Sequence, residues 1–433
     1  MKKVYFLVVT LAVIVFCSCD GGKNSRKHGG NNTGFGNNTI TNNLTLIKPA
    51  VNVYIENSAS MDGYVEGVTE FEQTVYNYLS DIKISDFTDT LNLFYINSQI
   101  IPYGSNVTDF IEKLEPTTFK ARGGSRGTTD ISNVFKAILA ETKVNNVAIL
   151  ITDAIFSPGK GKNAQQYLIN QQIGIKNTMA EYLKNFPNTA VVVYQLSSNF
   201  KGKYFNREDM PTNINAQRPY YIWVVGDVAN IFMLKALIPE TNFKGSGIHH
   251  SFTLLPSFEK EIEDYAILNS PKLGSFDRDK NTPKTSIYNI KKASSGVQKG
   301  NFMFTIGMDL SLFSVLLGDE YLMNTESYAR MIDKQPNNDY FIEMEHSSNP
   351  NTKHTHNMKL TTEKVATGEL EIVLRSQMPQ WVYEINDDEG LDINNNNAIN
   401  KTFGIKYLVE GVYEAYQMRG NAIYTTMKFN LKK

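Results

Sequence analysis

Apolar runs alternate with segments of helical periodicity over residues 48–245. Five runs that are apolar almost throughout are typical of buried strands. They lie at 51–55, 91–96, 147–152, 190–196 and 220–225. Four other segments space their apolar residues as amphipathic helices do. They lie at 66–83, 130–141, 163–186 and 228–238. This alternation predicts an α/β domain with a doubly wound, mostly parallel sheet flanked by helices on both faces.

The pattern changes from residue 246 onward, where shorter strand-like runs alternate with polar, Asn-rich turns. The runs lie at 302–306, 340–344, 370–374, 381–385 and 423–429. Frequent period-two alternation favours antiparallel pairing. A helical spacing over 402–418 adds one helix. We therefore expect a β-rich α+β domain over 246–433, with a sandwich as one possible form, and we find no catalytic constellation in it.

The first residues have the pattern of an export signal. Two lysines precede an apolar run that is shorter than the roughly 20 residues needed to cross a bilayer. The run ends in Phe16-Cys17-Ser18-Cys19, which resembles the lipobox of bacterial lipoproteins. We expect a signal peptide over 1–18, lipid on Cys19 and a flexible Gly- and Asn-rich tether over 19–47. An ordinary secretory signal with two incidental cysteines is the alternative.

Composition removes several classes of function. Lys plus Arg number 43 and Asp plus Glu 44, so the chain has no excess of basic charge for nucleic-acid binding. With 24 Phe and 23 Tyr, it is too aromatic to be mostly disordered. Its 2 cysteines are Cys17 and Cys19. Cleavage before Cys19 leaves one cysteine, which carries lipid, so cysteine nucleophiles, Cys-ligated zinc and an internal disulfide are excluded.

Candidate chemistry lies after the predicted strands, where the sites of parallel sheets form. Glu56, Ser58 and Ser60 follow the first strand, and Asp153 follows the strand at 147–152. Thr129 precedes the helix at 130–141 and is its expected N-cap. All five side chains offer oxygen atoms, which suit a hard divalent cation such as Mg²⁺ or Mn²⁺.

These residues resemble the von Willebrand factor A (vWA) domain and its metal-ion-dependent adhesion site, MIDAS. That site combines Asp-x-Ser-x-Ser, a Thr from a second loop and an Asp from a third. Here Ser58, Ser60, Thr129 and Asp153 match in order and context, whereas Glu56 replaces the first Asp. The longer Glu56 side chain either binds the cation or crowds it out. Gly is also common after the last Asp, where this chain has Ala.

The resemblance implies a binding module rather than an enzyme. A protein or another ligand would supply an acidic group to complete the cation's shell. With the lipid anchor, we expect a bacterial envelope lipoprotein, on the periplasmic face of the outer membrane or at the cell surface. The alternative is a metal-free structural or assembly component, in which these side chains only cap loops and bond backbone amides.

Two other motifs suggest weaker hypotheses. Gly123 to Gly127 matches the G-x-S-x-G nucleophile elbow around Ser125, but no clear strand precedes it, so a hydrolase is the least favoured function. His354 and His356 would share one face of a strand and, with His346, could bind a transition metal. No acidic partner is evident in the sequence, so an exposed polar strand is the preferred interpretation.

Overall fold

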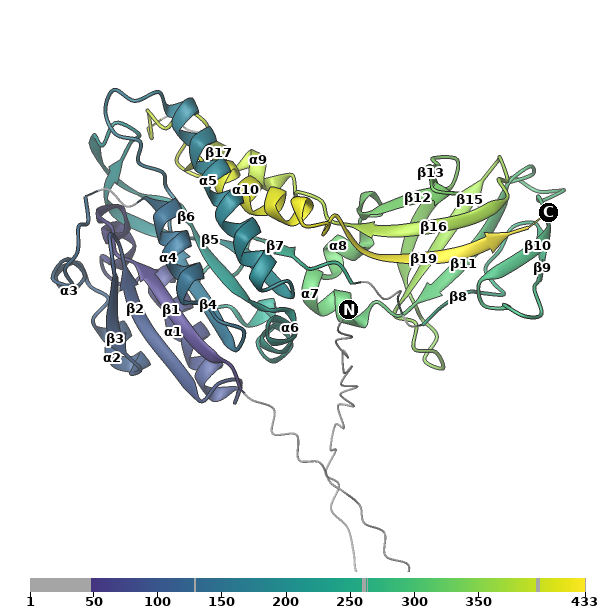
Figure 1. Cartoon of the computed structure of the whole chain (residues 1–433), viewed down its shortest axis with the longest axis horizontal. Helices are drawn as coiled ribbons and strands as arrows, with labels where there is room; N and C mark the ends of the chain where they lie inside the picture. The colour runs from purple at the N-terminus through teal and green to yellow at the C-terminus, as the bar shows by residue number, and fades with distance from the viewer. Residues whose placement is uncertain (1–47, 128–129, 259–261, 263, 395–397, 433) are drawn as a thin grey trace, which may run out of the picture. The chain divides into compact units, whose positions relative to one another are not determined.

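The computed structural model describes residues 48–127, 130–258, 262, 264–394 and 398–432, all within one compact unit of the chain (Figure 1). Within this part, a seven-stranded sheet has the order β3-β2-β1-β4-β6-β5-β7. Its strands are β1 (Ala50–Glu56), β2 (Thr90–Ile96), β3 (Ile100–Gly104), β4 (Asn146–Thr152), β5 (Thr189–Phe205), β6 (Pro211–Asp227) and β7 (His250–Leu254). Each of the five predicted strands is present. No helix in the described residues is long and apolar enough to cross a bilayer.

The expectation of a mostly parallel sheet is wrong. β1 pairs in parallel with β2 and with β4, but β6 is antiparallel to both β4 and β5. β3 and β7 are antiparallel edge strands. The physical reason is the short connection at 206–210, because only a long crossover can make neighbouring strands parallel. β5 and β6 extend well beyond their apolar runs, and their additional residues form a long hairpin.

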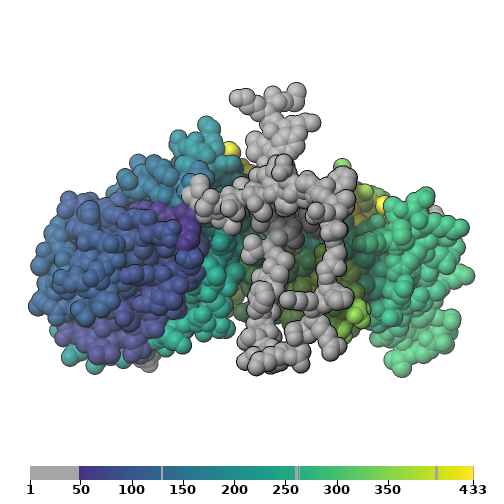
Figure 2. Space-filling view, turned by 90° about the horizontal axis from the view of Figure 1, so that it is seen from below, coloured from purple at the N-terminus to yellow at the C-terminus, as the bar shows by residue number. Residues whose placement is uncertain are grey.

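Helices cover both faces of this sheet, as predicted (Figure 1). The helices of this region are η1 (Ala59–Val65), α1 (Glu70–Ile84), α2 (Val107–Glu112), α3 (Pro116–Lys120), α4 (Ile131–Glu141), α5 (Ala164–Asn185), α6 (Val228–Leu237) and η2 (Glu240–Asn242). Apolar residues of α1, α2 and α6 pack on one face, and those of α4 and α5 on the other. In Figure 2, the residues of this part, coloured purple to teal, gather at the left of the view.

Beyond β7, the described residues form two larger sheets. One has the order β13-β12-β16-β19-β10-β9 and the other β14-β15-β11-β8. The strands are β8 (Tyr265–Ile267), β9 (Ser275–Arg278), β10 (Ser286–Lys291), β11 (Phe302–Met308), β12 (Tyr328–Ile332), β13 (Gln335–Pro336), β14 (Phe341–His346), β15 (His356–Thr362), β16 (Gly368–Arg375) and β19 (Ile423–Leu431). All pairs except β10–β19 are antiparallel, and both sheets contribute to one apolar cluster. The β-rich expectation is confirmed.

The stretch from 381 to 418 returns to the first sheet. Its elements are α9 (Trp381–Glu384), β17 (Asn386–Asp387), β18 (Thr402–Phe403) and α10 (Ile405–Met418). Three short helices lie earlier in the chain: α7 (Ser311–Leu317), α8 (Asp319–Met323) and η3 (Thr325–Ser327). The predicted strand at 381–385 is wrong, because Trp381 and Val382 are buried from one helical turn. α10 packs along α5 in the same apolar cluster. The core of the α/β part thus includes residues beyond 245, its expected end.

Candidate functional site

The register of the sheet brings the ends of β1 and β4 together. These strands are parallel neighbours, with Ile55 opposite Ile151. Glu56, the last residue of β1, therefore lies beside the end of β4, and Asp153 is the first residue after β4. The sequence predicted this juxtaposition, because carboxyl ends of neighbouring parallel strands meet at one edge of a sheet.

Both carboxylates are buried at this edge. Glu56 is 4% exposed and Asp153 is 1% exposed. The Thr152 hydroxyl donates a hydrogen bond to Glu56 Oε2 and accepts one from the backbone N–H of Ala154 at 2.8 Å. Sequence analysis missed Thr152 as a site residue, since its place at the end of an apolar strand gave no sign of this role.

Burial dominates the proton equilibria of the pair. Burial, together with the smaller effect of the nearby Asp153 charge, raises the pKa of Glu56 to about 8. Burial also raises the pKa of Asp153. Two carboxylates this close and this far from water are costly to ionise together. A cation between them would offset that cost.

The two carboxylate oxygens of Asp153 differ in their hydrogen bonds. Its Oδ1 accepts a hydrogen bond from the backbone N–H of Ile155 at 3.1 Å, whereas its Oδ2 is buried with no hydrogen-bond partner among the described residues. A buried unpartnered carboxylate oxygen is expensive and calls for an explanation. In the metal-free interpretation, in which Asp153 bonds backbone amides, Ile155 accounts for Oδ1, and the nearby Ser60 hydroxyl is another polar group that stabilises the carboxylate.

The two serines lie beside this carboxylate pair. Ser58 is buried and Ser60 is half-buried, and their hydroxyl oxygens are 2.9 Å apart. Ser60 lies close enough to lower the pKa of Asp153, and Ser58 to lower that of Glu56, against the larger effect of burial. Neighbouring ligands of an octahedral Mg²⁺ ion are about 2.9 Å apart when each bond is about 2.05 Å. The two serine hydroxyls, which hydrogen-bond each other, already have that spacing.

Two glycines hold the serine segment against the β5–β6 hairpin. A Cβ on Gly63 of η1 would lie 2.5 Å from the Phe200 ring, and one on Gly202 would lie 2.9 Å from Gly63 Cα. The close approach therefore requires glycine at both positions. It fixes the path of η1 directly after Ser58.

Arg126 also bonds the segment that carries Ser58 and Ser60. Its Nε donates to Asn57 O at 2.6 Å, its Nη2 donates to Ser58 O at 3.1 Å, and it forms an ion pair with Asp62. The neighbouring Ser125 is exposed and follows α3 and a loop, so no strand leads into it. The G-x-S-x-G match therefore lacks the strand that a nucleophile elbow requires.

Thr129 and Cys19 lie outside the described residues. The predicted role of Thr129 as N-cap belongs to Asp130 instead, whose side chain accepts hydrogen bonds from the backbone of Ser132 and Asn133. Aspartate is at least as good a cap as threonine because its carboxylate also faces the positive end of the helix.

A buried arginine, which sequence analysis missed, faces the same region. Arg218 of β6 is 1% exposed, and its charge lowers the pKa of Asp153. Its Nη1 donates to backbone carbonyls at positions 398, 399 and 401, while its Nη2 has no partner in the described part of the chain. Only the antiparallel course of β6 brings Arg218 to this edge, and the sequence did not predict that course.

Ala154 occupies a backbone conformation that glycine favours. Its φ is 55°, in the left-handed region. The Gly common at the matching position of the resembled family would adopt this conformation without strain.

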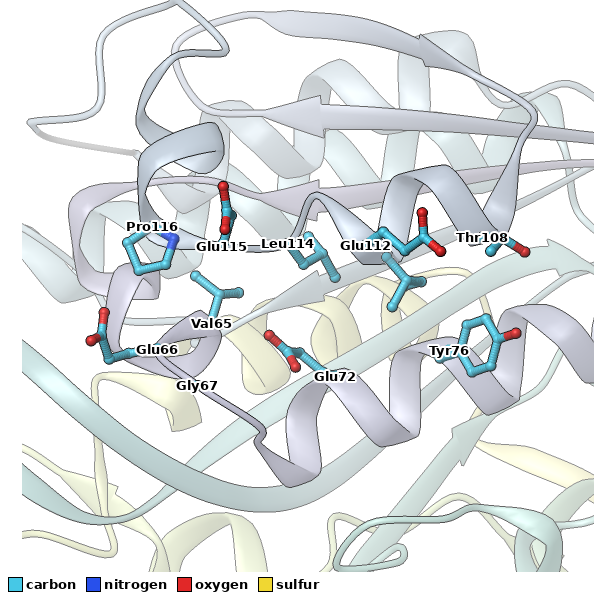
Figure 3. Close-up of a pocket in the computed structure, with 11 residues that line it drawn as sticks. Val65, Glu66, Gly67, Glu72, Tyr76, Thr108, Glu112, Leu114, Glu115 and Pro116 are labelled. Atoms are coloured by element: carbon cyan, nitrogen blue, oxygen red, sulfur yellow. The ribbon is translucent and has the colours of Figure 1, made fainter.

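A separate acidic groove lies at the far end of η1 (Figure 3). It has a volume of about 560 Å³ and is bordered by four glutamates: Glu66, Glu72, Glu112 and Glu115. None of the described site residues lines it.

No family model, curated protein or solved structure matches this chain. The vWA resemblance therefore rests on the chain's own residues and their arrangement.

Proposed function

We propose that this protein is a lipid-anchored binding protein of the bacterial envelope. Its α/β part would resemble a vWA domain and bind Mg²⁺ or Mn²⁺ at the ends of β1 and β4. The observation that carries the proposal is the buried Asp153 Oδ2, which has no hydrogen-bond partner in the described residues and lies beside a serine pair. The anchor rests on Cys19 and the residues before it.

Each side chain has a role in this proposal. Ser58 and Ser60 would supply neutral oxygens and Asp153 a charged one, while Glu56 would balance the remaining charge, directly or through water. Thr152 orients Glu56 through its hydrogen bond. Thr129, from its loop, completes the predicted donor set.

A bound divalent cation would offer a positive centre to an acidic group of a protein or other ligand. Of the four described donors, Ser60 is the one that retains exposed surface, so access would be from η1. Arg126 and Asp62 lie over the same segment and would contact the incoming ligand first.

The alternative is a metal-free structural or assembly component. Arg218 favours it, because a buried guanidinium already opposes the charge of Asp153. In this case Arg218 would stabilise the site, and added cations would change neither stability nor partner binding.

Thermal unfolding with and without Mg²⁺ tests the proposal. At saturating cation the melting temperature should rise by a few degrees, since about 100 Kd of ligand adds about 2.7 kcal/mol of stability. Ser60→Ala should reduce the rise, because it removes one oxygen donor at a half-buried position. Ser125→Ala is the matched control on an exposed loop and should retain the full rise. Equal shifts in both variants, or none in the parent protein, would exclude a cation at Ser60.

A further inference from the structure

Two histidines and an aspartate meet in the β-rich part of the molecule. β14 and β15 are antiparallel neighbours, and His346 lies directly opposite His356. Asp319, the first residue of α8, reaches the same point. None of these elements belongs to the sheet that carries Glu56 and Asp153.

The three side chains converge closely. Asp319 Oδ2 lies 3.1 Å from His346 Nε2, and Asp319 Oδ1 lies 3.2 Å from His356 Nε2. One ligand atom from each residue lies within 4.8 Å of the other two. In a tetrahedral zinc site with bonds of about 2.05 Å, ligand atoms are about 3.3 Å apart. Each imidazole Nε2 already lies at about this distance from one oxygen of Asp319, and the third pair of ligand atoms lies within 4.8 Å.

A neighbouring hydroxyl orients the buried histidine. Thr355 Oγ1 lies 2.8 Å from His356 Nδ1 and accepts a hydrogen bond from the backbone N–H of Leu310 at 2.9 Å. The Thr355 oxygen has a second lone pair that can accept from Nδ1–H, and in that tautomer the Nε2 lone pair faces Asp319. Outer partners of this kind fix the ring orientation of metal-binding histidines.

The cluster has one buried side and one open side. The side chain of His356 is 2% exposed, whereas those of His346 and Asp319 are 60% and 52% exposed. Three protein ligands at such a position leave room for a fourth from solvent or from a bound molecule.

The spacing of histidines in the sequence indicated a different pair, His354 and His356. A spacing of two predicted that His354 and His356 share one face of a strand, but β15 begins only at His356. His354 instead packs over Gly307, with its Nε2 3.7 Å from Asp264. The preferred interpretation of an exposed polar strand is wrong for His356, and the acidic partner that seemed to be missing is Asp319.

We propose that Asp319, His346 and His356 form a second metal site, selective for a divalent ion that prefers nitrogen ligands, with Zn²⁺ the best match. Two imidazoles and one carboxylate suit zinc, whereas an all-oxygen set suits Mg²⁺ or Mn²⁺. This inference is independent of the proposed function, because the two sites share no residue.

Zn²⁺ calorimetry on the purified full-length protein tests the site, with visible absorption of bound Co²⁺ as a spectroscopic readout. The protein must carry no polyhistidine tag and must first be freed of metal. One Zn²⁺ per chain should bind, and Co²⁺ should give the intense bands of a low-symmetry site. Asp319→Asn and His346→Ala should each weaken binding at least about tenfold. Both side chains are more than half exposed, so the fold should tolerate either change.

Two control variants separate the possible outcomes. His249→Ala removes an exposed histidine elsewhere and should leave Zn²⁺ affinity unchanged. Asp153→Asn should also leave it unchanged, even if it abolishes Mg²⁺ binding, so that each proposal can fail alone. No Zn²⁺ binding by the parent protein, or affinities that stay the same in Asp319→Asn and His346→Ala, would overturn the second site.

Discussion

Glu72 closes the first turn of α1 through a reciprocal pair of hydrogen bonds with Thr69. Thr69 Oγ1 accepts from Glu72 N at 3.3 Å, and the Glu72 carboxylate accepts from the backbone N–H of Thr69. This is a capping box, in which glutamine works as well as glutamate. Partial burial raises the pKa of Glu72 to about 7 from its ordinary value of 4.5. The folded protein therefore binds a proton here more tightly than the unfolded chain does.

The sign of the pH dependence follows from this raised pKa. The contribution of Glu72 to stability is fully present below pH 4.5 and is lost as the pH rises through about 7. Glu72→Gln should remove that loss and retain the cap. Urea unfolding should show the variant equal to the parent near about pH 4 and more stable by on the order of 1 kcal/mol near about pH 8, a value reduced for solvent screening.

Glu66→Gln, at an exposed glutamate of the same groove, is the control and should change the pH profile far less. Parallel profiles for the parent protein and Glu72→Gln would show that burial does not act on this carboxyl group.

At the scale of elements, the hydrophobic periodicity of the chain located some strands well and others only in part. It located β1, β2 and β4 within about one residue, because their apolar runs are bounded by polar loops. It failed for the β5–β6 hairpin, whose outer halves alternate with polar residues. It also failed for 381–385, because a single helical turn and a short strand would bury the same apolar side chains and so give the same sequence pattern.

The contact between α10 and α5 depends on one small residue. A Cβ on Gly411 would lie 2.8 Å from Gln172 O and 3.0 Å from Ile175 Cβ. Gly411→Leu should therefore destabilise the protein by about 1–3 kcal/mol, as overpacking does. Gly174 of α5 is the matched control, since it is exposed and a Cβ there meets nothing within 4 Å. Gly174→Ala should stabilise by about 0.5–1 kcal/mol through helix propensity.

Urea unfolding of both glycine variants measures this difference directly. If Gly411→Leu is as stable as the parent protein, α10 does not pack on α5 through this face.

At the scale of the whole molecule, the two candidate sites differ in how far the sequence could predict them. Glu56, Ser58, Ser60 and Asp153 follow two strands whose parallel pairing is predictable, so their convergence was predictable too. The position of Arg218 at this site was not predictable, because it depends on the antiparallel pairing of β6 with β4.

The histidine cluster was predictable only in part. His346 and His356 meet through the register of β14 with β15, and Asp319 arrives from α8, an element with no signal of its own in the sequence. Contacts that depend on antiparallel register and on short helices leave no local pattern.

Mn²⁺ calorimetry on the parent protein and on Asp153→Asn tests the central claim most directly. Asparagine keeps the shape of the side chain but removes the charge that a cation at Ser58 and Ser60 requires. The His346→Ala variant serves as a control, and its Mn²⁺ binding should equal that of the parent protein. We predict one Mn²⁺ site per chain that Asp153→Asn abolishes. No binding by the parent protein, or equal binding by Asp153→Asn, would contradict a cation site at the ends of β1 and β4.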